Sequence, residues 1–128
     1  MTGRIPMIFM VHEHWATHHH FDFRLEMDGV LKSWAVPKGP PLRSGVKRLA
    51  IAVEDHPLEY GSFEGAIPEG EYGAGKVAIW DNGEYLLKER NTRKLCFQLS
   101  GKKLQGDYEL LFMKEERGRQ QWLLFKRK

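Results

Sequence analysis

Short runs of apolar residues, many of them alternating with polar ones, recur along the whole chain and are separated by turns that contain glycine. Such an alternation is typical of β-strands, because successive side chains of a strand point to opposite faces. No long segment repeats its apolar residues at helical spacing, and residues 44–50 are expected to form at most a short turn. The pattern predicts about nine strands, at 7–14, 20–29, 30–37, 48–56, 76–83, 84–89, 94–101, 106–115 and 120–128.

The connections between these runs favour antiparallel neighbours. Asp28-Gly29 and Asn82-Gly83 are hairpin signals, since both pairs tolerate the positive φ of a tight turn. Segments 99–108 and 115–121 are expected to form two further connections. Many short strands in a chain of 128 residues predict one all-β domain, covering residues 1–128, with the strands closed into a barrel or stacked as a sandwich.

Composition excludes several classes of protein. No apolar run approaches the roughly 18 residues of a membrane span, and no secretory signal pattern is present, so we expect a cytoplasmic protein without a membrane partner. The single cysteine, Cys96, cannot form an internal disulfide and stands among apolar residues. The net charge of +3 is mild, although the basic residues near 38–48 and at 126–128 are compatible with a polyanionic partner.

Five of the six histidines lie between residues 12 and 20, directly before a predicted strand. A purification tag does not explain them, because the run of three is short and internal. The period of two places His20, Asp22 and Arg24 on one face of this strand, and it places the other face in the core. The residues of that apolar face are Phe21, Phe23 and Leu25.

The predicted strand at 48–56 can be sorted in the same way. One face carries Leu49, Ile51 and Val53, and the other carries the polar residues together with two small alanines. If this second face meets the polar face of segment 20–26, inside a barrel or across a concave sheet, the two form a pocket. The residues of the second face are Arg48, Ala50, Ala52, Glu54 and His56.

Imidazole and carboxylate ligands together suit first-row divalent ions such as Mn²⁺, Fe²⁺ or Zn²⁺. His14, His20 and Asp22 are predicted to form a three-ligand site with open positions, and either His12 or His18 could replace one of them on sequence grounds alone. The competing interpretation is a set of hydrogen-bonded or surface histidines on a strand edge.

Two further patterns bear on phosphate binding. The segment 70–76, GEYGAGK, has the spacing of a phosphate-binding loop, but a strand with Val77 follows it instead of Ser or Thr and a helix, so we expect a glycine-rich turn. Arg24, Lys38 and Arg48 could clamp a phosphate next to a metal, or could pair with nearby acids.

Three blocks of the chain resemble one family. HEHWATHHHFDFRLEMDGVLKSWAVPKGP at 12–40, KRLAIAVEDHPLEYGSFEGAIPEGEYGAGKVAIWDNGEY at 47–85 and WLLFKRK at 122–128 are similar to the 3′-phosphoesterase domain of bacterial DNA ligase D and its free-standing relatives. The resemblance implies a small closed antiparallel β-barrel of about eight strands with short helical turns. It further implies a Mn²⁺-dependent hydrolase, with Co²⁺ or Zn²⁺ as alternatives, that removes 3′-terminal ribonucleotides and 3′-phosphates and leaves a 3′-hydroxyl.

The resemblance also assigns roles to residues. The metal ligands of the family match His14, His20 and Asp22. Few residues precede the first matching block, so the strength of the diesterase step is left open, more than that of the monoesterase step. The catalytic and phosphate-contacting residues of the family match Arg24, Lys38, Arg48, Glu54, His56 and Tyr60.

The partners expected from the resemblance are DNA or RNA 3′ ends in a primer–template duplex, with a ligase and a polymerase as separate proteins, and the protein itself is expected to be a monomer. Two other functions fit parts of the sequence. A non-haem iron oxygenase also uses two histidines and a carboxylate. A non-catalytic nucleic-acid-binding barrel would use basic residues and aromatic ones such as Trp15, Trp34 and Tyr72.

Overall fold

The computed structural model of the chain describes residues 6–71 and 74–128. These residues form nine strands and one short 3₁₀ turn, η1, at Leu58–Ser62. At 44–50, where at most a short turn is expected, the chain turns at Gly45 with φ of 89° and then enters the strand Lys47–His56. The strands are β1 Met7–Trp15, β2 His19–Met27, β3 Val30–Val36, β4 Lys47–His56, β5 Gly65–Ile67, β6 Gly75–Asn91, β7 Lys94–Gly101, β8 Gln105–Glu116 and β9 Arg119–Lys126.

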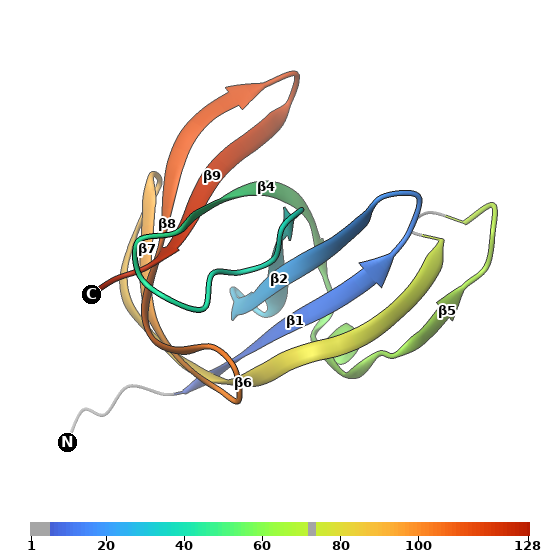
Figure 1. Ribbon diagram of the computed structural model, residues 1–128, viewed down its shortest axis with the longest axis horizontal. Coiled ribbons are helices and arrows are strands. Elements are labelled where there is room, and N and C mark those ends of the chain that lie inside the picture. The colour runs from blue at the N-terminus through green and yellow to red at the C-terminus, as the bar shows by residue number, and fades with distance from the viewer. Residues whose placement is uncertain (1–5, 72–73) are drawn as a thin grey trace.

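The sheet closes on itself. Its strand order is β1-β2-β3-β4-β9-β8-β7-β6-β5, every pairing is antiparallel, and β1 also pairs with β6. The expected eight-stranded antiparallel barrel is therefore confirmed, with β5 added as a ninth strand along the edge of β6 (Figure 1). Closure leaves few unpaired strand edges.

The barrel interior is apolar and aromatic. Phe23 of β2 stacks on Phe97 of β7 with ring centroids 5.8 Å apart, and Phe97 stacks on Tyr108 of β8 at 6.4 Å. Leu25 is completely buried beside Phe23, as the period of two predicts for β2. The Tyr108 hydroxyl donates a hydrogen bond to the Pro41 carbonyl at 2.7 Å, which ties the loop after β3 to the barrel.

One predicted turn exists and another does not. Asp28 and Gly29 have φ angles of 57° and 80° and join β2 to β3 tightly, as predicted. The predicted turn at Asn82-Gly83 is wrong, because residues 76–83 and 84–89 belong to the single long strand β6. The Asp81 carboxylate instead accepts the backbone N–H groups of residues 102–104, which closes the β7–β8 connection.

The face assignment for β4 is also wrong. Ala50 is fully buried in the core, whereas Leu49 on the opposite face is 43% exposed. A bulge then interrupts the strand: Ser33 of β3 lies opposite Val53, but Leu31, two residues earlier, lies opposite His56, three residues later. On a regular strand Ala50 and His56, six residues apart, would share a face. The extra residue reverses the alternation, so His56 lies on the face opposite to Ala50.

The glycine-rich segment 70–76 lies partly outside the described residues, because Tyr72 and Gly73 are not described. Its end does show why glycine is needed. Gly75 has φ of 130°, and a Cβ there would overlap the Trp15 carbonyl across the β1–β6 pairing. A strand and not a helix follows, which confirms the interpretation as a turn where the backbones approach closely. No helix in the described part of the chain is long and apolar enough to cross a membrane.

Candidate active site

The polar row of β2 lies on the outer wall of the barrel, opposite the apolar core. Asp22 and Arg24 are nevertheless only 7% and 3% exposed. The segment from Pro57 to Ile67, which contains η1 and β5, covers this part of the wall. Its Gly61 sits directly on Met10 and Leu31, and a Cβ there would lie 3.5 Å from both side chains. Beside this cover the outer wall holds a pocket of about 590 Å³.

Three predicted ligands converge in this pocket. One ligand atom each from His14, His20 and Asp22 lie within 4.8 Å of one another. The Asp22 carboxylate lies between the histidines, with Oδ2 3.6 Å from His14 Nδ1 and Oδ1 3.3 Å from His20 Nε2. All three come from the β1–β2 hairpin, where His14 and His20 are cross-strand partners. Two imidazoles and one carboxylate form a donor set that fits a first-row divalent ion.

The hydrogen bonds around His20 prepare it for this role. Its Nδ1 donates to the His18 carbonyl at 2.9 Å, so the lone pair of the neutral ring is on Nε2, which faces Asp22. The hydrogen bond to Asp22 raises the pKa of His20. Burial opposes ionisation of Asp22, but the His20 hydrogen bond and the charge of Arg24 outweigh it, and the pKa of Asp22 is lowered. The carboxylate is therefore ionised at neutral pH.

Arg24 is fixed by hydrogen bonds to four residues and by a ring contact to a fifth. Its Nη1 donates to Ser33 Oγ at 2.8 Å and to His56 Nδ1 at 3.2 Å, and Nη2 donates to Asp22 Oδ2 at 3.4 Å. Nε donates to His12 Nδ1 at 2.9 Å, and the guanidinium stands over the ring of Tyr60, 5.0 Å from its centroid. Since a guanidinium has five N–H donors, the described residues leave one Nη2 hydrogen for a ligand.

His12 is the innermost member of this network and is completely buried. Its Nε2 donates to the Phe63 carbonyl at 3.1 Å, so its Nδ1 carries the lone pair that accepts from Arg24. Burial and the charge of Arg24 lower the pKa of His12 to about 4, which keeps the ring neutral. His12 thus bridges the wall of the barrel and the covering segment, and its Nδ1 lone pair is used by Arg24 and is not directed at the three candidate ligands.

His56 and Tyr60 complete the pocket from the β4 bulge and η1. Because Arg24 can only donate, His56 Nδ1 accepts, and the neutral ring carries its proton on Nε2. Burial and the nearby Arg24 charge lower the pKa of His56. Its ring stacks on Tyr60 with centroids 4.5 Å apart. Burial raises the pKa of Tyr60, which keeps the phenol protonated.

The remaining predicted residues are distributed unequally. Glu54 is exposed and lines the pocket. Lys38 is exposed in the loop after β3 and does not line the pocket. Arg48 also lies outside the pocket; its side chain is on the core side of β4, and its buried Nε has no hydrogen-bond partner among the described residues. The structure thus brings together seven of the nine predicted residues: His14, His20, Asp22, Arg24, Glu54, His56 and Tyr60.

Three contributors were missed or misjudged from the sequence. Sequence reasoning gave His12 a choice between ligand and peripheral roles, and only the Arg24 contact defines what it does. Ser33 gave no signal, because a serine within an apolar strand has no distinctive pattern. Arg119 at the start of β9 lines the pocket although it is 95 residues from Arg24. It is brought there by barrel closure, which no local pattern encodes.

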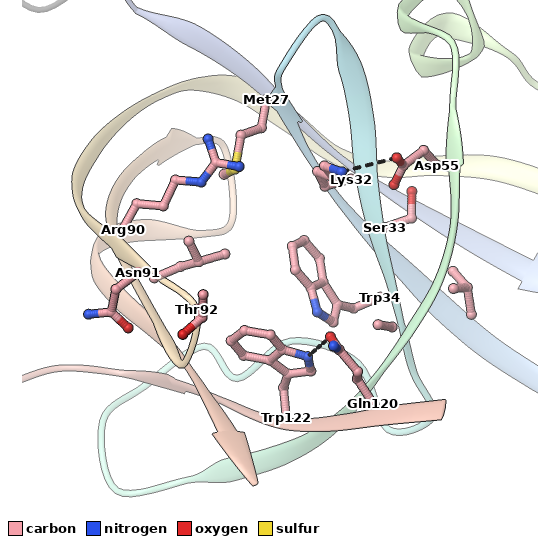
Figure 2. A pocket seen from close by; sticks show the side chains of 13 residues that line it. Met27, Lys32, Ser33, Trp34, Asp55, Arg90, Asn91, Thr92, Gln120 and Trp122 are labelled. Atoms are coloured by element: carbon pink, nitrogen blue, oxygen red, sulfur yellow. Dashed lines mark hydrogen bonds and ion pairs between the residues drawn. The ribbon is translucent and has the colours of Figure 1, made fainter. Parts of the chain in front are cut away.

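A second pocket of about 480 Å³ opens at a mouth of the barrel. Figure 2 shows Trp34 and Trp122 facing each other there, with the Trp122 indole N–H donating to Gln120 at 3.2 Å. Lys32 and Asp55 form an ion pair at its rim. This pocket holds none of the predicted catalytic residues.

Comparisons with known proteins point to one family. The family model of the DNA ligase D 3′-phosphoesterase domain matches residues 12–112. The chain is 49% identical over 125 residues, 94% of its length, to the multifunctional non-homologous end joining protein LigD of Pseudomonas aeruginosa. It is 53% identical over 107 residues, 80% of its length, to the protein of that name from Mycobacterium bovis, and 43% identical over 114 residues to that of Mycolicibacterium smegmatis.

The chain spans only 15%, 14% and 15% of the length of these three relatives, so it corresponds to one part of each of them. The matched region contains His14, His20 and Asp22 together with Arg24, His56 and Tyr60, and it ends within β8. Over this region the sequence blocks, the barrel and the family model agree. The chain therefore belongs to the DNA ligase D 3′-phosphoesterase domain family.

Proposed function

We propose that this protein is a metal-dependent 3′-end-healing phosphoesterase of DNA repair. It removes 3′-terminal ribonucleotides and 3′-phosphates from primer–template duplexes of DNA or RNA, and it leaves a 3′-hydroxyl for a separate ligase or polymerase. The observation that carries the proposal is the His14, His20 and Asp22 cluster in one pocket with the Arg24 guanidinium. A metal ion held by these three ligands and the guanidinium beside it could bind the same phosphate together.

The chain would hold the ion with His14, His20 and Asp22. We propose Mn²⁺, and Co²⁺ or Zn²⁺ fit the same ligands. When bound, the ion supplies Lewis-acid stabilisation of a phosphate oxygen and lowers the pKa of a water molecule.

The other residues of the pocket act on the phosphate and on the leaving group. Arg24 directs its remaining Nη2 hydrogen at a phosphate oxygen and offsets the charge that develops there. His56, with its proton on Nε2, donates to another phosphate oxygen or to the oxygen that leaves. Tyr60 supports both residues through ring contacts, and its hydroxyl is available to phosphate or ribose.

Lys38, Arg48 and Glu54 have weaker geometric support. Glu54 lines the pocket two residues before His56 on β4, and we retain it as a residue that positions His56. We retain Lys38 and Arg48 as proposed phosphate contacts, reached by a nucleic acid that extends beyond the pocket.

A duplex whose primer ends in one ribonucleotide tests the proposal directly. With Mn²⁺ we expect the primer to be shortened and then dephosphorylated, and with chelator we expect no reaction. His20→Ala should reduce both steps by about 10³-fold or more, because a metal ligand is lost. Products are resolved at single-nucleotide resolution. An intact primer with every divalent ion tried would contradict the proposal.

The two other functions give different outcomes in the same preparations. An iron oxygenase would convert 2-oxoglutarate to succinate, and a non-catalytic module would bind the duplex with or without metal and never cleave it. Arg24→Lys separates the roles of the site further. It should lower the rate about 10²-fold, because the planar donor array is lost, while Mn²⁺ affinity measured by calorimetry stays within a few-fold of the parent.

A further inference from the structure

The hairpin formed by β8 and β9 projects beyond the body of the barrel (Figure 1). Its turn is built on Arg117 and Gly118, with φ angles of 56° and 76°. Arg119 follows at the first position of β9 and is opposite Glu116. The hairpin therefore carries charged residues past the end of the sheet, at a place where they contribute nothing to the barrel core.

The register explains how Arg119 reaches the active-site pocket. β4 and β9 pair as far as Ile51 opposite Gln121. Beyond this last pair, Val53 follows Ile51 by two residues and Arg119 precedes Gln121 by two, and both line the pocket that contains His14, His20 and Asp22. Arg119 is thus held beside the β4 bulge that carries His56.

Arg119 also joins this pocket to a second hollow. A pocket of about 680 Å³ runs along the hairpin, and Arg119 is the residue that lines both. This hollow along the hairpin is otherwise lined by Ile51, Glu116, Arg117 and Gln121. Arg117 and Arg119 are both exposed, and neither forms an ion pair in the described part of the chain. The hollow is thus lined by two guanidiniums without an ion pair and by one carboxylate, Glu116, whose Oε1 lies 3.8 Å from Lys114 Nζ, so its net charge is positive.

We propose that this hollow is a track for the sugar-phosphate backbone of the bound nucleic acid, with Arg119 contacting a phosphate next to the one that reacts. The inference rests on the proposed function for the identity of the ligand. It assigns Arg119 a role in binding and not in the chemical step. Guanidiniums bind phosphate oxygens bidentately, and surface arginines of this kind position a duplex without reading its sequence.

Binding of a fluorescently labelled primer–template duplex, followed by anisotropy at several NaCl concentrations, tests the track. Arg119→Ala should weaken binding about three- to tenfold at low salt and reduce the slope of log K against log salt by about 0.9, the value for one lost phosphate contact. Glu116→Gln should strengthen binding, because it removes the one acidic side chain of the track.

Lys102→Ala is the control. It removes one exposed positive charge, and Lys102 lines neither pocket and has no ion pair with a residue of the track. If Lys102→Ala weakens binding as much as Arg119→Ala does, or if Arg119→Ala binds like the parent, the track does not exist. Either result leaves the cleavage assay of the parent protein unaffected. Conversely, the expected binding pattern without any cleavage would refute the proposed enzyme and retain the track.

Substrate length provides a second measurement. Since the contact lies outside the reacting phosphate, Arg119→Ala should lower kcat/KM more for the duplex than for a nucleoside 3′-monophosphate, and mainly through KM. An equal loss on both substrates would place Arg119 at the reacting group and overturn the assignment.

Discussion

On β2, Phe23 and Leu25 point into the barrel while Asp22 and Arg24 point outward, and all four side chains are largely buried. For the inner pair, removal from water is itself favourable, by about 1.5–3 kcal/mol for each side chain. For the outer pair it is unfavourable, because a buried charge is costly unless partners replace its hydration. Burial of side chains on this strand thus stabilises the protein on one face and destabilises it on the other.

The difference shows where the fold and the site obtain their specificity. The inner face needs only apolar side chains of suitable size, and aromatic rings from several strands meet there. The outer face needs particular partners: His12, Ser33, His56 and Asp22 each hold one part of Arg24. These contacts orient the guanidinium beside the three candidate ligands His14, His20 and Asp22, an arrangement that stability alone would not favour.

Phe23→Ala compared with His20→Ala is expected to give the largest contrast between the two faces. Truncating Phe23 should lower the free energy of unfolding by about 3–5 kcal/mol, because it leaves a cavity in the core. His20→Ala, made three positions earlier on the outer face, should change stability by less than about 1 kcal/mol, although it removes activity. Chemical denaturation of both variants measures the difference, and a comparable loss of stability in the two would contradict it.

Substitutions at His12 sharpen the comparison within the outer face. His12→Leu removes the acceptor of Arg24 Nε and the donor to the Phe63 carbonyl, and should lower the rate about tenfold to 10²-fold. His12→Gln offers an amide oxygen and an amide N–H in the same directions and should recover most of that loss. Turnover is measured on the primer–template duplex. A His12→Gln variant as inactive as His12→Leu would mean that His12 acts through its shape or ring chemistry instead.

Mild acid should produce the smallest effect, again on one face only. The pKa values of His12 and His56 are both lowered by burial and by Arg24, so the folded outer layer favours the neutral rings. Their contribution to stability is complete above their ordinary pKa of about 6.5 and is lost as the pH falls below it. Hydrogen exchange at pH 5 should therefore increase in residues 57–67 before it increases in β7 and β8. Uniform exchange across both regions would argue against a separate outer layer.

The core residues of β2 and the polar row on its outer face could be predicted from the sequence, but the other parts of the outer layer could not. The period of two in β2 identified both its core residues and the row of His20, Asp22 and Arg24, because one regular strand presents both sets. The same period failed in β4, where a bulge reverses the alternation before His56. It also could not reveal the covering segment 57–67 or the approach of Arg119, since both depend on which strands become neighbours when the barrel closes.

The positions of the three candidate ligands along the chain have a consequence for the order of folding. His14, His20 and Asp22 belong to one hairpin and are separated by at most eight residues. Closing the barrel instead pairs Met7 with Tyr85 across 78 residues, a contact with a much higher entropic cost. The ligand set is therefore a local structure that can assemble before the ring of strands is complete, whereas the Arg24 network requires the chain as far as Phe63. Metal binding and phosphate chemistry would then be acquired at different stages of folding.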